Sequence, residues 1–214
     1  MRIEIWSDIV CPWCYIGKRR LEAALSRFPR RGEVEVIYRS FELDPGAPAA
    51  SEKPLDQALA EKYGVGLAGA RAMMARVAGV AAEEGLRYDF SIAKRGNSFD
   101  AHRLLHLAAE RGRQAEMAER LFSAYFSEGA PISDRAALSR LAGEVGLDAE
   151  EGLAGGAYNE AVRADEERAR ALGITGVPFF LIDGRLGLSG AQPADAILSA
   201  LTRASEGRGA EGPS

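Results

Sequence analysis

Two cysteines, Cys11 and Cys14, are the only thiols of this chain and are separated by two residues in the segment SDIVCPWCYIGKRRLE. A disulfide across so short a loop removes little entropy from the unfolded chain, so it adds less stability than one across a long loop. A chain of 214 residues buries enough apolar surface to fold without cross-links. We therefore expect the cysteine pair to carry redox chemistry rather than stability.

The residues around the cysteines predict where a helix begins. Residues 2–7 are expected to form a short buried strand, and SDIV is expected to turn into a helix. Cys11 then lies at or near the N-cap, Pro12 at the first helical position and Cys14 about one turn inside. Free amides and the positive end of the helix dipole stabilise a thiolate at such a position.

This placement predicts a division of roles between the two thiols. Cys11 attacks a disulfide as the thiolate, and Cys14 resolves the mixed disulfide that forms. A Cys-x-x-Cys pair within a strand–helix–strand pattern is typical of thiol–disulfide exchange, and the redox-active disulfide Cys11–Cys14 requires no added cofactor. Asp8, three residues before Cys11, is a candidate proton relay for Cys14, or equally a turn-forming aspartate.

A zinc site is the main alternative use of the cysteines. His102 and His106 are four residues apart on one predicted helix face and could join Cys11 and Cys14 as ligands. However, about 87 residues separate the two pairs, against about 12 to 15 in finger-type sites. We therefore predict no metal, and a surface or capping role for the histidines.

The rest of the chain predicts a core interrupted by helices. A second strand within EVEVIYRSFEL completes a strand–helix–strand unit with parallel strands. Helical periods then continue to about Leu172 and predict five or six helices. The segment GVPFFLIDGRLGLSGAQPADAILSAL predicts a strand, a hairpin at Asp183-Gly184, a partner strand and a helix that Pro193 opens. Five glycines stand where helix ends are expected: Gly64, Gly85, Gly112, Gly146 and Gly173.

Charge and hydropathy exclude several classes of protein. A formal net charge of −4 and a pI near 5.4 argue against a nucleic-acid or membrane-surface binder. The basic run Lys18-Arg19-Arg20 is interpreted as a solvated helix face. No apolar stretch reaches the ~18 residues of a membrane span. MRIEIW carries no apolar signal region, so we expect the cytoplasm, where disulfides persist mainly as transient or catalytic ones.

Taken together, CPWC after the first strand, the helical block and GVPFFLIDG before the last hairpin resemble the DsbA-like thioredoxin-fold oxidoreductases, most of all their FrnE-like cytoplasmic branch. The resemblance extends over nearly the whole chain, in the segments DIVCPWCYIGKRRLE, NSFDAHRLLHLA, LFSAYFSEG and GITGVPFFLIDGRLGLSGAQP. It implies an α/β, thioredoxin-like fold with a large all-helical insertion. The core would comprise residues 1–43 and 174–205, the insertion residues 44–173, and a disordered tail residues 206–214.

The resemblance also implies a site. Cys11 and Cys14 would be the attacking and resolving thiols, with a cis-proline segment at Val177-Pro178 beside them. In that fold the backbone before the proline pairs with an extended substrate peptide, so Val177 is expected to bind substrate together with Pro12 and Trp13. The expected partners are disulfide-containing proteins, peptides or small molecules.

The same superfamily includes glutathione-dependent relatives, the 2-hydroxychromene-2-carboxylate isomerases and kappa-class glutathione transferases. Their Asn…His-Arg segment resembles Asn97, His102 and Arg103 here, but they usually carry serine where Cys11 stands and lack the second cysteine. Retention of both thiols favours electron exchange over isomerisation, and glutathione stays open as a partner. The Pro-Trp dipeptide differs from the Pro-His of periplasmic DsbA enzymes and the Gly-Pro of thioredoxins, so the resemblance does not give the direction of electron flow.

Overall fold

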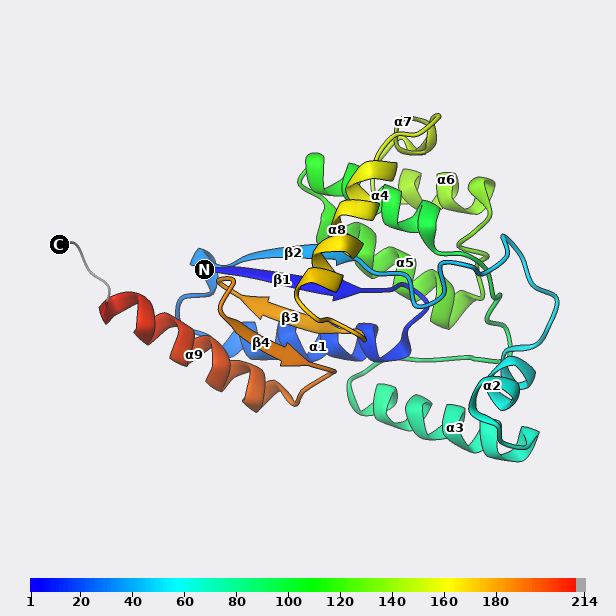
Figure 1. The fold of residues 1–214 in the computed structure, drawn as a ribbon, viewed down its shortest axis with the longest axis horizontal. Helices are drawn as coiled ribbons and strands as arrows, with labels where there is room; N and C mark the ends of the chain where they lie inside the picture. The colour runs from blue at the N-terminus through cyan, green and yellow to red at the C-terminus, as the bar shows by residue number, and fades with distance from the viewer. Residues whose placement is uncertain (211–214) are drawn as a thin grey trace.

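A four-stranded mixed sheet forms the centre of the protein in a computed structural model, which describes residues 1–210 (Figure 1). The strand order is β2–β1–β3–β4, with β1 and β2 parallel and β3 antiparallel to both β1 and β4. The strands are β1 (Arg2–Ser7), β2 (Glu35–Ser40), β3 (Phe179–Ile182) and β4 (Leu186–Ser189). The predicted strand–helix–strand unit and the hairpin at Asp183-Gly184 are confirmed.

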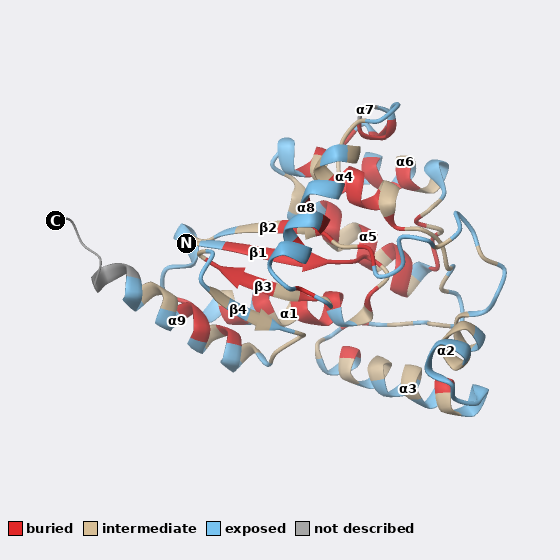
Figure 2. Cartoon of the chain, viewed as in Figure 1, coloured by how far each residue is buried: buried red, intermediate tan, exposed pale blue. Residues whose placement is uncertain are grey.

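Two helices complete this part of the fold. Helix α1 (Pro12–Arg27) connects β1 to β2 and packs against α9 (Ala194–Ala210), and a 3-10 turn, η1 (Arg31–Glu33), precedes β2. Strand β1 alternates between two faces: Ile3 and Ile5 join the main core, whereas Trp6 joins a smaller cluster that includes Ala169 of the helix covering the other face. Coverage of both faces explains why nearly all of β1 is buried (Figure 2).

Seven helices lie between β2 and β3 within the described residues, one or two more than predicted. They are α2 (Leu55–Tyr63), α3 (Leu67–Glu83), α4 (Phe99–Glu110), α5 (Gln114–Glu128), α6 (Arg135–Glu144), α7 (Ala149–Leu153) and α8 (Asn159–Ala171). Two of them give weak periodic signals: α7 has five residues, and α2 buries none of its side chains. The five glycines expected at helix ends all have positive φ angles.

The C-terminal end corrects one prediction. Residues 206–210, expected to be disordered, continue helix α9, and residues 211–214 lie outside the described range. Once a helix is nucleated, each further residue adds a hydrogen bond, so α9 continues beyond the buried Leu201. The division into core and insertion stays a prediction. Among residues 1–210 no single helix is long and apolar enough to cross a membrane; only α2 and α3 together, bent by 107°, reach that length and composition.

Candidate functional site

Cys11 is the N-cap of α1 and lies where the chain leaves β1 and turns into the helix. Its φ and ψ of −89° and 113° are extended, and Pro12 occupies the first helical turn, as predicted. Its main-chain N–H donates to the carbonyl of Asp8 at 3.0 Å, and its own carbonyl accepts from the N–H of Cys14 at 3.0 Å. The first turn of α1 contains no acidic residue, so no carboxylate there opposes a thiolate at Cys11.

Cys14 lies one turn inside and is held as a thiol. Burial is the main cause that raises the pKa of Cys14 well above its ordinary value, and the neighbouring Cys11 raises it further. The backbone of Asp8 and the hydroxyl of Ser7 oppose this rise by hydrogen bonding. Both cysteines are free thiols, and each is less than 5% exposed. Cys14 therefore has to lose a proton in a poorly solvated place before it can attack a disulfide.

The Val177-Pro178 segment lies against the thiols. The peptide bond between these residues is cis, and the Cys11 thiol donates a weak hydrogen bond to the Val177 carbonyl with Sγ and O 3.5 Å apart. The Pro178 carbonyl accepts from the N–H of Gly190 at 2.8 Å, which ties it to the loop after β4. Thus the structure brings three residues named from the sequence, Cys11, Val177 and Pro178, to one point.

Gly17 was missed by the sequence analysis and permits this close packing. A Cβ on Gly17 would lie 3.0 Å from Cγ of Pro178 and 3.2 Å from Cζ of Phe180. A glycine inside a helical pattern is itself a signal of a close approach, because it lowers helix propensity by about 1 kcal/mol relative to alanine. The missing side chain lets the second turn of α1 lie directly against the cis-proline loop.

Aromatic side chains surround the turn. The Tyr88 hydroxyl donates to the Pro12 carbonyl at 2.8 Å, and the Tyr88 ring stacks on Phe126 with ring centroids 4.5 Å apart. Burial raises the pKa of Tyr88, so the phenol stays protonated and remains a donor. Trp13, between the cysteines, is 40% exposed and presents an apolar surface beside Cys11.

Asp8 is both a turn residue and a neighbour of a histidine. Its carboxylate accepts from the main-chain N–H groups of Leu43 at 2.7 Å and Val10 at 3.4 Å. Its Oδ1 also lies 3.5 Å from Nε2 of His102. Because His102 is completely buried, the predicted surface or capping role is wrong for this residue. The alternation of apolar and polar residues along α4 did not reveal it, since the contact is made with a segment 94 residues earlier.

The zinc alternative finds no support in the geometry. His106, the second histidine, lies against Ser40 at 3.1 Å and Asp165 at 3.2 Å, whereas His102 lies against Asp8. In the part of the chain that the structure describes, no three His, Cys, Asp or Glu side chains are grouped so that they could hold a metal ion. The two histidines therefore contact different residues: His106 contacts Ser40 and Asp165, and His102 contacts Asp8.

The other residues of the Asn…His-Arg segment make structural contacts. Asn97 donates through Nδ2 to Oε1 of Glu42 at 3.0 Å, and Arg103 donates to the carbonyls of Ala157 at 2.7 Å and Gly155 at 3.0 Å. Burial raises the pKa of Glu42, although its ion pair with an arginine of α8 opposes the rise. Asn97 thus contributes to a buried acidic cluster near His102, and Arg103 fastens α4 to the loop before α8.

The basic run corrects another prediction, because it is not a solvated face. Lys18 is 4% exposed and forms ion pairs at 2.5 Å with Glu22 and with Glu119 of α5. Arg20 pairs with Glu84 at 2.6 Å. Long basic side chains can bury their stems while their charged ends meet carboxylates from other helices, which a local reading of sequence does not reveal.

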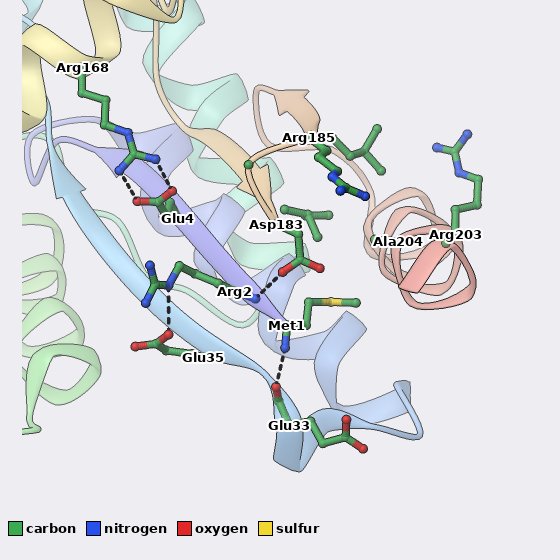
Figure 3. A pocket seen from close by; sticks show the side chains of 14 residues that line it. Met1, Arg2, Glu4, Glu33, Glu35, Arg168, Asp183, Arg185, Arg203 and Ala204 are labelled. Carbon is green, nitrogen blue, oxygen red and sulfur yellow. Dashed lines mark hydrogen bonds and ion pairs between the residues drawn. The ribbon is translucent and has the colours of Figure 1, made fainter. Parts of the chain in front are cut away.

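A cavity of about 1030 Å³ lies at the opposite end of the sheet from the thiols (Figures 1 and 3). Its charged side chains interact with one another: Arg168 binds Glu4, Arg2 binds Glu35, and the main-chain N–H of Arg2 donates to Asp183 at 2.8 Å. No residue predicted for the redox site lines this cavity, so we place the functional site at the thiol end.

A thioredoxin fold with a thiol pair at the start of α1 and a cis-proline loop against it defines a class of oxidoreductases. A family model described as the DSBA-like thioredoxin domain matches residues 2–202, and the chain belongs to this family. Among solved structures, the probable DsbA oxidoreductase SCO1869 from Streptomyces coelicolor is similar, with 48% identity, a TM-score of 0.91, and coverage of 96% of this chain and 90% of that one. The predicted fold class is confirmed.

Three further proteins are similar to this chain. The uncharacterized protein YwbO of Bacillus subtilis is 29% identical over 187 residues, which are 85% of this chain and 86% of YwbO. A 2-hydroxychromene-2-carboxylate isomerase (16% identity, TM-score 0.73, all of both chains) and the cytosolic disulfide reductase DsbM from Pseudomonas aeruginosa (22% identity, TM-score 0.63, 95% and 98% of the chains) share the fold. At these identities they are informative about the fold alone.

Proposed function

We propose that this protein is a thiol–disulfide oxidoreductase that exchanges electrons with disulfides of proteins, peptides or small molecules through the Cys-Pro-Trp-Cys pair. The observation that carries the proposal is the position of Cys11 at the N-cap of α1, with its sulfur directed at the Val177 carbonyl beside Pro178. Amides at a helix start favour a thiolate, which is the reactive form.

The reaction proceeds in two exchanges. Cys11 Sγ attacks one sulfur of the substrate disulfide, a mixed disulfide forms, and the other substrate sulfur leaves as a thiolate that takes a proton from solvent. Cys14 then loses its proton and attacks Cys11 Sγ, which releases the second substrate thiolate and leaves the Cys11–Cys14 disulfide. The substrate gains two electrons and the protein loses two. The reverse sequence oxidises a substrate dithiol.

The surroundings supply a docking place for the substrate. An extended peptide can align with the backbone of Val177, whose carbonyl lies at the attacking sulfur. Trp13 is exposed next to Cys11 and offers an apolar surface to the substrate. The Pro12 carbonyl accepts a hydrogen bond from the Tyr88 hydroxyl, which holds the turn in place. Substrate binding by Pro12, Trp13 and Val177 is part of the proposal.

Glutathione is the second candidate partner. A structure of DsbM from Pseudomonas aeruginosa is described with GSH, and the similarity of 23% identity and TM-score 0.61 supports testing the tripeptide here. A glutathione-dependent isomerase or transferase activity is the alternative function. It is disfavoured because it would leave the second thiol, Cys14, without a role. We also propose the cytoplasm as the compartment and the FrnE-like branch as the subgroup.

Substitution of the two thiols tests the proposal. We expect Cys11→Ser to abolish turnover of insulin or of a scrambled disulfide substrate. We expect Cys14→Ser to accumulate mixed disulfides with the substrate or with glutathione, detectable by mass spectrometry, because nothing releases the partner. Full activity of Cys11→Ser would contradict the thiol mechanism, and glutathione-dependent isomerisation by the same variant would favour the alternative.

A further inference from the structure

Within the described chain, one amide at the start of α1 is left for the Cys11 sulfur. Pro12, at the first helical position, has no N–H. The N–H of Cys11 donates to the Asp8 carbonyl, and that of Cys14 donates to the Cys11 carbonyl, each at 3.0 Å. The N–H of Trp13 has no hydrogen-bond partner among residues 1–210. Because an N-cap side chain accepts from the N–H two or three positions further on, Trp13 supplies the amide that remains for this sulfur.

The Cys11 sulfur changes its hydrogen bonding when it loses its proton. As a thiol it donates to the Val177 carbonyl, with Sγ and O 3.5 Å apart. A thiolate has no proton to donate, so it can only accept, and hydrogen bonds to a charged acceptor are the stronger ones. The thiolate therefore requires a donor, and the N–H of Trp13 occupies the position from which N-cap side chains are bonded.

Tyr88 binds the other end of the same peptide group. The carbonyl of Pro12 and the N–H of Trp13 belong to one planar amide. The Tyr88 hydroxyl donates to this carbonyl at 2.8 Å. A donor at the carbonyl oxygen makes the N–H of the same amide a stronger donor, because hydrogen bonds in a chain polarise one another. The hydroxyl, the amide and the sulfur can thus form one chain of hydrogen bonds when Cys11 is a thiolate.

The segment that carries Tyr88 is fastened to helix α5. The N–H of Asp89 donates to the Phe126 carbonyl at 2.8 Å, and the Ser127 hydroxyl donates to the Arg87 carbonyl at 2.6 Å. The ring of Tyr88 stacks on that of Phe126 with centroids 4.5 Å apart. Since the backbone on both sides and the ring are held, the hydroxyl has a fixed direction, and it orients the turn that it binds.

The titratable groups around the phenol belong to α1 and α5. After burial and the attacking thiol, Tyr15 and Cys14 of α1 also raise the pKa of Tyr88, whereas Arg19 lowers it. Tyr15 and Arg19 both bind Glu119 of α5, so the charge of this arginine is compensated. Because the pKa of the phenol is raised, its hydroxyl stays protonated at neutral pH and acts as a donor whether the thiols are ionised or not.

We propose that Tyr88 is a positioning residue for the attacking thiolate. Through the Pro12 carbonyl it orients and polarises the amide whose N–H, on Trp13, bonds the sulfur. The inference rests on the proposed function. The hydroxyl keeps its proton throughout, the proton of Cys11 passes to solvent, and the electron pair left on the sulfur is the one that attacks a disulfide. The segment between α3 and α4 thus acts on the rate of attack.

The pH profile of alkylation separates this role from a structural one. In Cys14→Ser protein Cys11 is the only thiol, and its alkylation by iodoacetamide is followed as a function of pH. We expect Tyr88→Phe, which keeps the ring, to raise the midpoint, the pH of half-maximal rate, by about 0.5 unit, so that alkylation below the midpoint slows about threefold. The plateau rate at high pH, where the sulfur is fully ionised, should change less than about twofold. A loosened turn would instead change the plateau and leave the midpoint in place.

Tyr15→Phe is the matched control. The ring of Tyr15 belongs to the same aromatic cluster, with its centroid 6.1 Å from that of Tyr88, but its hydroxyl donates to Glu119 at 2.7 Å. We expect this variant to keep the midpoint. An unchanged midpoint in Tyr88→Phe, or an equal shift in Tyr15→Phe, would overturn the inference. If wild-type protein exchanges no electrons with disulfides, the proposed function fails and this inference with it; normal wild-type exchange with an unmoved midpoint in Tyr88→Phe overturns only the inference.

Replacement of Tyr88 by 3-fluorotyrosine covers the case in which Tyr88→Phe does not fold. This residue keeps the ring and the hydroxyl, and the fluorine makes the phenol a stronger donor, while burial keeps it protonated. We expect the midpoint of alkylation to move below that of the protein with tyrosine, opposite to the shift in Tyr88→Phe. A midpoint equal to or above that of the protein with tyrosine would overturn the inference.

Discussion

Glu4 and Asp8 are buried carboxylates four residues apart, one in β1 and one in the turn after it, yet their partners differ. Glu4 accepts from the guanidinium groups of Arg39 at 2.6 and 2.9 Å and of Arg168 at 2.6 and 2.8 Å. Among residues 1–210 no arginine binds Asp8; its carboxylate accepts from the amides of Val10 and Leu43 and lies 3.5 Å from the imidazole of His102. The first carboxylate is held by two guanidinium groups, whereas the second is held by main-chain amides and lies beside an imidazole.

The two histidines show the same contrast. His106 lies within 3.2 Å of Asp165 and stacks on Tyr158, so its ring is held by partners that belong to the fold. Neither ring nitrogen of His102 has a hydrogen-bond partner among residues 1–210, and its Nε2 lies 3.5 Å from Oδ1 of Asp8. The two histidines therefore differ in how fully their ring nitrogens are hydrogen-bonded within the described residues.

The largest effect is expected from Asp8→Asn. The amide keeps the shape and can still accept from Leu43 N–H, but it cannot take up a proton, so resolution of the mixed disulfide should slow about 100-fold at pH 7. Quenched-flow decay of the mixed disulfide measures this, with alkylation of Cys11 as the internal reference. A resolution rate within twofold of that of the wild-type protein would show that Asp8 does not take up the proton of Cys14.

Glu4→Gln should lower stability and leave the rate of mixed-disulfide resolution unchanged. The change removes the negative charge that Arg39 and Arg168 share, although Arg39 keeps its ion pair with Asp165, and we expect the free energy of unfolding to fall by about 2 kcal/mol. This is less than for a fully buried pair, because both arginines are partly exposed and solvent screens them. Urea denaturation measures the loss. Resolution kinetics should match wild type, and a changed pH profile would show that the two carboxylates do not differ as described.

Gly17→Ala tests whether the thiol end is packed more tightly than the helical insertion. Its Cβ would meet Pro178 at 3.0 Å, so overpacking should outweigh the gain in helix propensity, and stability should fall by about 1 kcal/mol. The matched control is Gly79→Ala in α3, where nothing lies within 4 Å of the new Cβ, and stability should rise by about 0.5 to 1 kcal/mol. Thermal unfolding compares them; equal shifts in Tm would contradict the close approach.

The smallest effect concerns pH. Since the pKa of Cys14 is raised by burial, the folded state keeps a proton that the unfolded chain loses above about pH 8.5. The free energy of unfolding of the reduced protein should therefore fall as pH rises beyond 8.5, by under about 1 kcal/mol at pH 9 from this group. Cys14→Ala should lessen the fall. Burial raises the pKa of Tyr125 to about 12, so this buried tyrosine also lowers the free energy of unfolding as pH rises, but at higher pH than Cys14 does. An identical slope in both proteins would argue against a buried neutral thiol.

Local signals were sufficient for the elements that place the thiols. The alternation of β1, Pro12 at the helix start and the Asp183-Gly184 turn each act over a few residues, and each was predicted correctly. The contacts of Lys18 with α5 and of His102 with Asp8 join segments about 100 residues apart, and no local period encodes them. The sequence therefore located the thiol pair and Asp8, but not the contact between Asp8 and His102.

The bond from Tyr88 to the Pro12 carbonyl has a consequence for how this architecture can be altered. Tyr88 belongs to the segment after α3, so the loop that carries the sulfurs is anchored from outside the sheet as well as from within it. A trimmed protein in which a short linker replaces the inserted helices would lose this outer anchor. The segment between β2 and β3 thus helps to hold the turn that carries the two cysteines, and we expect a protein without it to hold that turn less firmly.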